Sequence, residues 1–364
     1  MNRRFNYRIY PNDAQKAVFA INFGCARFVY NYFVGVNENK YKENKTFMFK
    51  DEMSKQLTIM KRIPEYEFLR IGSSVVEQQV IIHLDRALKD CGSKVKNRKD
   101  FPKFKSKRDK QNFSIVGDNT VFRIENNKLW LTKVKGLIDV RWSRSLPSKP
   151  SSLTITRSKL GNYYVSFVVE VEEEISTADK VIGIDLGIET FATTSEGVKY
   201  KLPNLTRHYN KVRRRQQDLT RKLKGSKNRE KARVKLAKAH QTISDIREDF
   251  HNKTVSQLVN ENQVIVVETL KVKQMMKNRQ LARMIGRQGW NTFITKLNDK
   301  CSQRGRLIYP INQYIPTSQV CSSCNYKWGK LNLKVRSITC INCGTIHDRD
   351  VNAAINILNE YNRR

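Results

Sequence analysis

Alternating apolar and polar residues predict two groups of β-strands along the chain. In the first half, residues 2–10 alternate, and shorter alternating runs follow between residues 113 and 174, at 121–124, 129–133, 153–157 and 163–171. Strands at this spacing are typical of a small barrel or sandwich. In the second half, unbroken β-branched runs at 181–187 and 264–268 predict buried strands, 189–194 a hairpin partner and 306–309 a last strand.

Apolar residues spaced three and four apart predict helices between these strands. The first helix, residues 14–35, follows a capping Asn12 and carries an aromatic stripe that includes Phe19, Phe23 and Phe33. Packing is favoured over base stacking for this stripe, because the spacing is that of one helix face. Further helices are predicted at 50–60, 73–90, 204–240 and 289–301. If residues 2–10 belong to the β-rich domain, the first three helices form an insertion in it.

The net charge of the chain indicates what kind of partner it binds. The sequence has 69 Lys and Arg against 34 Asp and Glu, a net charge of +35. Such an excess favours a polyanionic partner, and nucleic acid is preferred over a membrane surface because no amphipathic anchor accompanies the charge. Basic residues concentrate at 94–110, where Phe101 and Phe104 interleave with them, and at 204–240. Contact with a nucleic-acid backbone is favoured over a solvated linker or face for both segments. The candidate contacts are Lys103, Lys105, Lys107, Arg213, Arg214 and Arg215.

Four of the seven cysteines form the most specific motif in the chain. Cys321-x2-Cys324 and Cys340-x2-Cys343 can each place two thiolates on one turn, and four sulfurs complete a tetrahedral shell, which predicts one structural Zn²⁺ ion. We expect a cytoplasmic protein without disulfides, because no run of 18 apolar residues and no secretory signal is present. The other cysteines, Cys25, Cys91 and Cys301, are predicted to be buried small residues.

Three carboxylates are the candidate catalytic groups. Asp185 interrupts the apolar run at 181–187, Glu268 ends the second buried strand, and Asp350 begins a helix. A strand-end cap would explain Asp185 alone, but an ionised carboxylate is costly to bury unless it is paired or holds a metal. Two divalent cations about 4 Å apart need such a cluster of oxygens to hydrolyse a phosphodiester, which predicts two Mg²⁺ ions. No Ser-His or Cys-His pair competes with this site. For His347, a role in supporting the ligands of the acidic site or a purely structural role is favoured over direct assistance to hydrolysis.

Over essentially its whole length the sequence resembles the TnpB family of transposon-encoded RNA-guided nucleases, relatives of the type V CRISPR effectors. The resemblance rests on Gly183-Ile184-Asp185-Leu186-Gly187, Glu268-Thr269-Leu270, the four clustered cysteines and Asp348-Arg349-Asp350-Val351-Asn352-Ala353-Ala354. It implies a RuvC nuclease domain of RNase H-like fold, with Asp185, Glu268 and Asp350 as the catalytic trio. Asp348 then has a capping or pairing role, since on a helix it points about 200° away from Asp350.

The resemblance also implies a multidomain α/β protein. A β-barrel wedge domain would cover residues 1–10 and 101–175, a helical recognition insertion 11–100, the RuvC domain 180–310 and 345–364, and a zinc ribbon that binds target nucleic acid 311–344. The implied partners of this monomer are a guide RNA from the transposon end and double-stranded target DNA flanked by a short motif. By position in the family, Phe49, Ser74 and Gln78 would read that motif, and a Gln amide can pair with adenine in the major groove.

Two other functions compete with an RNA-guided, Mg²⁺-dependent DNA endonuclease. A guide-directed DNA-binding repressor that has lost cleavage would lack one of the acids, and none of the three is missing. A DNA transposase that acts directly on transposon ends would use a similar acidic trio, but the helical insertion and the β-barrel match a guide-RNA scaffold. We therefore predict the endonuclease.

Overall fold

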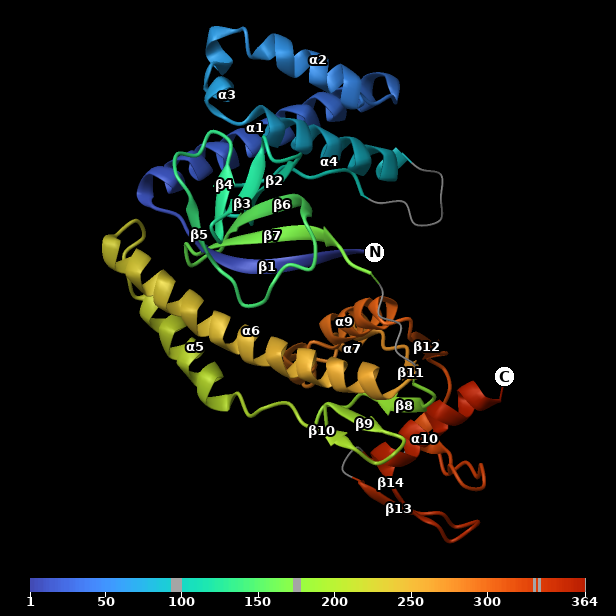
Figure 1. Ribbon diagram of the computed structural model, residues 1–364. Coiled ribbons are helices and arrows are strands. Elements are labelled where there is room, and N and C mark those ends of the chain that lie inside the picture. Colours follow the sequence, from blue (N-terminus) through green and yellow to red (C-terminus); the bar gives the residue numbers. More distant parts are fainter. Residues whose placement is uncertain (93–99, 173–177, 330–331, 333–334, 364) are drawn as a thin grey trace. The chain divides into compact units, whose positions relative to one another are not determined.

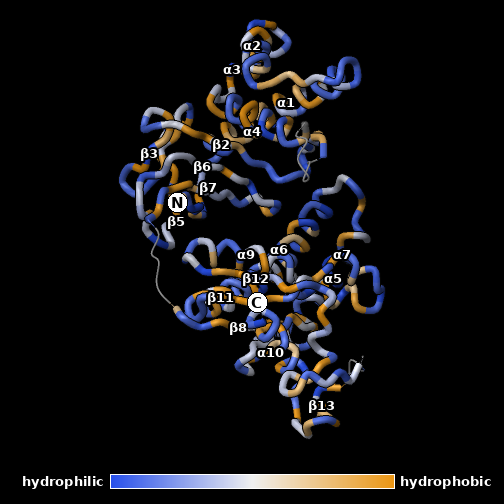
Figure 2. Tube along the Cα trace, turned by 90° about the vertical axis from the view of Figure 1, so that its right-hand side faces the viewer, coloured by the Kyte–Doolittle hydropathy of each residue, from blue (hydrophilic) through white to orange (hydrophobic). Residues whose placement is uncertain are grey.

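The computed structural model describes residues 1–92, 100–172, 178–329, 332 and 335–363. The chain divides into two compact units, Met1–Glu172 (unit 1) and Glu173–Arg364 (unit 2). Figure 1 shows the elements of each unit. Apolar and polar residues interchange along the chain in both units (Figure 2). The polar linker that the sequence indicates at 172–180 lies at the division and falls partly outside the described residues.

Unit 1 contains a seven-stranded antiparallel sheet in the order β2-β6-β7-β1-β5-β4-β3. The first strand, β1 (Asn2–Tyr10), lies between β7 and β5, so it does belong with the β-rich segment, as predicted. The other strands are β2 (Gln111–Val116), β3 (Phe122–Glu125), β4 (Lys128–Leu131), β5 (Ile138–Arg141), β6 (Pro150–Arg157) and β7 (Tyr163–Glu170). The sequence predicted β1, β3, β4, β6 and β7, but named no run at β2 or β5.

The strands of unit 1 curl around one core, which they share with helix α1 (Asp13–Asn44). Ile9 and Val165 from the sheet are buried in it together with Phe19 and Phe23 from α1. The rings of these two phenylalanines lie 5.7 and 5.2 Å from the ring of Phe113 on β2. The aromatic stripe of the first helix therefore packs in the core, as predicted.

Helix α1 is longer than predicted. A capping box begins it, in which the Asn12 side chain accepts from the Gln15 amide at 2.9 Å and the Gln15 side chain accepts from the Asn12 amide at 3.0 Å. It ends only at Asn44, where Lys45 takes the left-handed conformation. The remaining helices of unit 1 are α2 (Lys50–Met60), η1 (Pro64–Tyr66), α3 (Phe68–Ile71) and α4 (Ser74–Gly92). The predicted helices at 50–60 and 73–90 are thus confirmed as α2 and α4.

By length and composition alone, α1 is long and apolar enough to cross a membrane, and it is the one such helix among the described residues. The sequence predicted no membrane span. Phe19, Val29 and Phe33 of α1 are buried in hydrophobic clusters of unit 1. This apolar side of the helix is therefore already covered by protein.

Unit 2 is built on a five-stranded mixed sheet in the order β10-β9-β8-β11-β12. The central strand β8 (Val181–Asp185) pairs antiparallel with β9 (Ala192–Thr194) and parallel with β11 (Val264–Glu268), which pairs parallel with β12 (Leu307–Ile311). A short β10 (Lys199–Tyr200) completes the sheet. The predicted strand at 264–268 is confirmed to its ends, and the hairpin partner of β8 is confirmed as β9.

Helices cover both faces of this sheet. Val255 of α6 (Lys227–Glu261) and Phe293 of α9 (Trp290–Gln303) pack with Ile265 on one face. Ile357 of α10 (Arg349–Asn362) packs with Val264 on the other, as expected because consecutive residues of a strand point to opposite faces. The other helices are α5 (Thr206–Thr220), α7 (Val272–Met275), α8 (Ala282–Gln288) and η2 (Thr317–Gln319). The basic stretch at 204–240 is thus a helical pair, α5 and α6, but α6 continues well past the predicted end.

A small hairpin carries the second pair of clustered cysteines. Its strands are β13 (Ser337–Thr339) and β14 (Ile346–Asp348), and Ser337 pairs with Asp348. Strand β14 leads directly into α10. The hairpin therefore extends beyond residue 344, where the sequence placed the end of the zinc ribbon.

Candidate active site and metal centre

The register of the central sheet brings two of the predicted carboxylates together. Strands β8 and β11 run parallel with Ile184 opposite Val267, so Asp185 and Glu268 stand at the same end of adjacent strands. Asp350 lies in the first turn of α10, which packs on β8. The charges of Glu268 and Asp350 both act on Asp185. The fold thus brings three acids from three distant segments into one electrostatic cluster.

Two carboxyl groups of this cluster, those of Asp185 and Glu268, resist ionisation. Burial raises the pKa of Asp185 well above its ordinary value, and the negative charges of Glu268 and Asp350 raise it further, while Arg349 and Arg336 oppose the shift. Burial also raises the pKa of Glu268 to about 7, and a hydrogen bond from the Leu186 backbone lowers it in part. Like charges that share a poorly solvated site favour a bound cation, because it compensates both the repulsion and the lost hydration. The donor set is all oxygen, which fits a hard divalent cation.

A glycine lets α10 approach the strand that carries Asp185. A Cβ atom built on Gly183 would collide with the backbone oxygen of Ala354 and lie 2.8 Å from the backbone nitrogen of Leu358. Only glycine therefore fits where β8 meets α10. The close contact fixes the start of α10, and with it Asp350, relative to Asp185.

Asp348 has the capping and pairing role that the sequence predicted. It is the N-cap of α10, and one carboxylate oxygen accepts from the amides of Asp350 and Val351, each at 3.1 Å. Its other oxygen pairs with Lys199 at 2.6 Å. These partners hold its pKa below its ordinary value despite partial burial.

Arg336 is a residue of this site that the sequence did not single out. Its Nη1 lies 3.3 Å from Oδ1 of Asp350, and its Nη2 lies 2.6 Å from Oε2 of Glu189. The backbone oxygen of Arg336 accepts from the Arg349 amide at 2.9 Å, which ties it to the start of α10. No periodicity or spacing marks such a residue, because its partners come from the β8–β9 loop and from α10.

The four clustered cysteines converge as predicted. The ligand atoms of Cys321, Cys324, Cys340 and Cys343 all lie within 4.8 Å of one another, so the group can hold a metal ion. Nε2 of His347 lies 3.1 Å from Sγ of Cys321, which places this buried histidine against the cysteine cluster. The purely structural role considered for His347 agrees with this position. Cys25, Cys91 and Cys301 are buried, as predicted.

Two asparagines attach the segment around Cys321 to α10. The buried Asn352 accepts from the Ser322 amide and donates to the Val320 oxygen, each at 2.8 Å. Asn356 donates to the oxygens of Thr317 and Val320 at 2.8 and 2.7 Å. The sequence motif contained Asn352, but its role depends on loop carbonyls that no pattern of side chains reveals.

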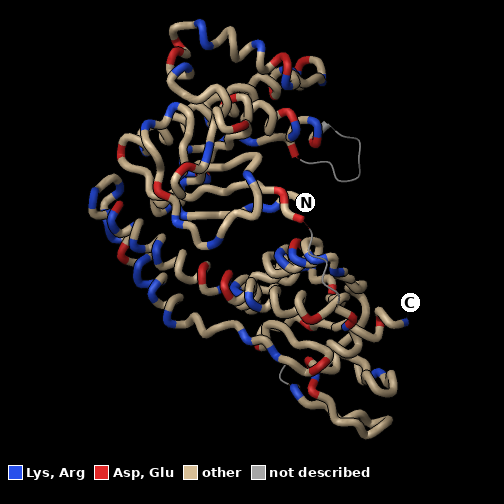
Figure 3. Tube along the Cα trace, in the orientation of Figure 1, with Lys and Arg blue, Asp and Glu red and all other residues tan. Residues whose placement is uncertain are grey.

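The basic residues predicted to contact nucleic acid lie in both units, and those of unit 2 lie on helix α5. Helix α5 borders a hollow of about 1060 Å³, whose lining includes Arg207, Lys211, Arg214 and Arg215 of α5 and the C-cap residue Arg221. Arg213 is not among its described lining residues. Figure 3 shows how densely Lys and Arg occupy α5 and its junction with α6.

In unit 1, the three lysines predicted to contact nucleic acid follow the helical block. All three lysines are exposed, and the ammonium of Lys105 also stacks on the Tyr30 ring at 3.7 Å from its centroid. Burial lowers the pKa of Lys105. The backbone amide and oxygen of Lys105 both bond Asn31 at 2.8 Å, so this part of the segment is anchored. The predicted contacts at 94–99 lie outside the described residues.

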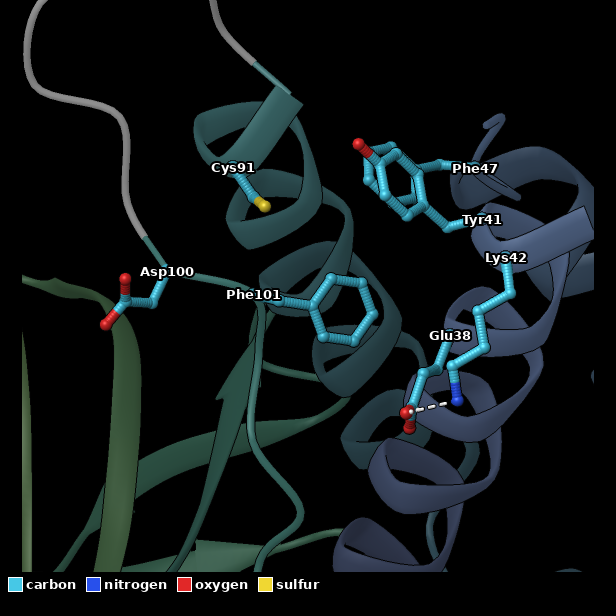
Figure 4. A pocket seen from close by; sticks show the side chains of 7 residues that line it. All are labelled: Glu38, Tyr41, Lys42, Phe47, Cys91, Asp100 and Phe101. Atoms are coloured by element: carbon cyan, nitrogen blue, oxygen red, sulfur yellow. Dashed lines mark hydrogen bonds and ion pairs between the residues drawn. The ribbon is translucent and has the colours of Figure 1, made fainter. Parts of the chain in front are cut away.

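The three residues predicted to read a DNA motif lie at two places along helix α4. Ser74 and Gln78 are exposed one turn apart on α4. Phe49 is next to Lys50, whose amide donates to Asp85, and Asp85 follows Gln78 by seven residues, roughly 10 Å of helix. The Phe49 ring lies 6.3 Å from Phe47. Phe47 lines a separate pocket of about 490 Å³ with Tyr41, Cys91 and Phe101 (Figure 4).

Known proteins resemble the chain along nearly its full length. Family profiles described as "Probable transposase" and "Cas12f1-like, TNB domain" match residues 165–279 and 290–357. A profile described as "Helix-turn-helix domain" matches residues 1–46, where the structure has β1 and α1. A Streptomyces pristinaespiralis protein named "Putative RNA-guided DNA endonuclease" is 39% identical over 98% of this chain and 89% of its own.

A second relative, "Putative RNA-guided DNA endonuclease InsQ" of Escherichia coli K12, is 28% identical over 97% of this chain and 91% of its own. Among solved structures, the chain resembles the protein in "Cryo-EM structure of the Cas12f1-sgRNA-target DNA complex" with a TM-score of 0.56 and 13% identity, over 99% of each chain. At that identity the likeness describes the fold alone.

Proposed function

Because this chain belongs to the TnpB family, as its 39% identity across nearly all of the Streptomyces relative shows, we propose that it is an RNA-guided DNA endonuclease. The observation that carries the proposal is the cluster of Asp185, Glu268 and Asp350 at one end of the unit 2 sheet. A central strand with an antiparallel neighbour on one side and parallel neighbours on the other supports an RNase H-like RuvC assignment.

The acid cluster would bind two Mg²⁺ ions through Asp185, Glu268 and Asp350. The donor chemistry fits: the site has only carboxylate oxygens as ligands, and burial disfavours the charge of Asp185 and Glu268 unless a cation is present. When bound, such ions polarise a phosphodiester and activate a water molecule. The chain itself contributes the fixed positions of the three acids, through the β8–β11 register and the close contact at Gly183.

The proposal also includes a zinc ion, a guide RNA and a target DNA. Cys321, Cys324, Cys340 and Cys343 would hold one structural Zn²⁺ ion, since four cysteine sulfurs complete a tetrahedral shell. A guide RNA from the transposon end would select double-stranded DNA by base pairing, and the basic segments would contact the phosphate backbones. The chain would act as a cytoplasmic monomer.

The domain assignment follows from the same proposal. The wedge domain (1–10 and 101–175) and the recognition insertion (11–100) would correspond to unit 1. The RuvC domain (180–310 and 345–364) and the zinc ribbon (311–344) would correspond to unit 2. In the recognition insertion, we propose Ser74 and Gln78 as readers of the flanking DNA motif, since both are exposed on one side of α4. Phe49 lies beside Phe47, and its proposed contact with the DNA motif would be separate from those of Ser74 and Gln78.

Cleavage of a matched plasmid with guide RNA and Mg²⁺ tests the proposal. Asp185→Ala and Asp350→Ala should abolish cleavage, while guide-dependent DNA binding without metal persists, because affinity comes from base pairing and basic side chains. Asp348→Asn is the matched control: asparagine caps a helix as well as aspartate does, so cleavage should continue. Normal cutting by Asp185→Ala would refute the site. A wild type that binds guided targets but never cuts them would favour the repressor.

A further inference from the structure

Arg336 and a divalent cation compete for the same carboxylate. The Nη1 atom of Arg336 lies 3.3 and 3.5 Å from the two oxygens of Asp350. A guanidinium in this position covers oxygen lone pairs that a cation needs, and it adds like charge beside the cation. If Asp350 is to bind a metal, Arg336 has to release it and needs another partner.

Glu189 is the partner that the fold provides. Its Oε2 lies 2.6 Å from Nη2 of the same guanidinium. Glu189 belongs to the loop after β8, not to the carboxylates proposed as metal ligands. Its side chain is 72% exposed, whereas that of Asp350 is 18% exposed, so the Glu189 charge costs less to keep in the absence of a cation.

Both partners of this ion pair have fixed backbones. The loop that carries Glu189 is held by the Gln288 side-chain amide, which donates to the Ile188 oxygen at 2.7 Å. Arg336 is held by the bond from the Arg349 amide to its backbone oxygen. The long Arg336 side chain already contacts both acids, so it can leave Asp350 while it keeps its contact with Glu189.

We propose that Glu189 is a positioning residue: it retains Arg336 beside the site when the guanidinium releases Asp350 to a divalent cation. This inference rests on the proposed function, because it assigns the acids to metal binding. Glu189 then lowers the free-energy cost of loading the site without touching the cation.

Mn²⁺ binding to the full-length, zinc-loaded protein without nucleic acid tests the idea, measured by titration calorimetry and by the electron paramagnetic resonance of free Mn²⁺. Glu189→Gln should weaken binding about fivefold, the size of one partly exposed ion pair. Arg336→Gln should tighten binding, because it removes the competing cation. The control Glu196→Gln removes another exposed acid of unit 2, paired with Lys180 at 3.5 Å, and should leave the affinity unchanged.

The double variant separates positioning from simple charge. If Glu189 acts through Arg336, adding Glu189→Gln to Arg336→Gln should cause no further loss of Mn²⁺ affinity. An equal loss with and without Arg336 would mean that Glu189 acts only by its charge, and would overturn the inference while leaving the proposed metal site intact. Mn²⁺ binding that is unaffected by Asp350→Ala would instead overturn the proposed metal site and the inference together.

Discussion

At the scale of single residues, ionising the acids of the candidate site costs free energy in the folded chain. Asp185 and Glu268 stand on adjacent strands, and burial makes the charged form of each costly. Replacing these acids with neutral residues of similar shape would stabilise the fold. Their presence is explained by a ligand that the acids bind, because stability alone selects against them.

The pKa of Glu268 predicts how the free energy of unfolding depends on pH. Its pKa is about 7 in the folded chain against an ordinary value of 4.5, so ionising Glu268 disfavours folding above pH 4.5, with the full cost reached above about pH 7. Without divalent cations, Glu268→Gln should therefore raise the unfolding free energy at pH 8 by about 1 to 3 kcal/mol. The gain should shrink as the pH falls from 7 to 4.5.

Urea unfolding monitored by circular dichroism, with EDTA present, checks this dependence. Glu261→Gln, at the exposed end of α6, makes the same charge change away from the cluster and should show no such trend. An equal stabilisation at pH 4 and pH 8 would contradict the assignment of the shift to Glu268.

At the scale of elements, the contact between β8 and α10 determines where Asp350 lies. Gly183→Ala should push α10 away, because the added methyl group meets backbone atoms of Ala354 and Leu358 that cannot rotate aside. We expect a loss of about 1 to 3 kcal/mol in unfolding free energy, typical of overpacking, and a loss of Asp350-dependent Mn²⁺ binding. Gly286→Ala in α8 is the control, since its nearest atom outside α8 would be a methionine methyl at 3.7 Å. Unchanged stability in Gly183→Ala would disprove the close packing.

The cysteine cluster makes a second prediction at this scale. Cys321→Ser should lose one equivalent of zinc, because a tetrahedral thiolate shell loses a ligand, and should also free His347 from its contact at 3.1 Å. Elemental analysis of freshly purified protein measures the zinc. Cys25 is buried in unit 1, away from the cluster in sequence, so the Cys25→Ser variant should keep the full zinc content. Wild-type protein without zinc would contradict the prediction.

The elements that the sequence predicted best are those with a strong local pattern. The β-branched run of β11 is bounded by polar residues and was predicted to its ends. The predicted end of α1 was wrong, because its last turns lack the apolar stripe and their end depends on the left-handed Lys45. Strands β2 and β5 were missed, although β5 is no shorter than β3 and β4, which were predicted. Arg336 was missed because its partners are distant in sequence.

At the scale of the whole chain, a net charge of +35 is the property that the sequence established most directly. The structure adds where part of that charge gathers: the hollow along α5 is lined by several basic side chains. A duplex or single strand seated there would release counterions from its phosphates, so its affinity should fall with salt. The sequence predicted basic helices here, but it could not say which arginines share one side.

Neighbouring arginines of α5 provide the matched comparison. Arg214 lines the hollow, whereas Arg213, one residue earlier and also exposed, does not. Arg214→Ala should weaken guide-RNA binding and reduce the slope of log affinity against log salt by about 0.7 to 0.9, the value for one lost phosphate contact. Arg213→Ala should change the slope less, although it removes the same charge from the same helix. Filter binding between 50 and 300 mM KCl measures both slopes. Equal reductions in the two variants would mean that the chain attracts RNA by its total charge and not through the hollow along α5.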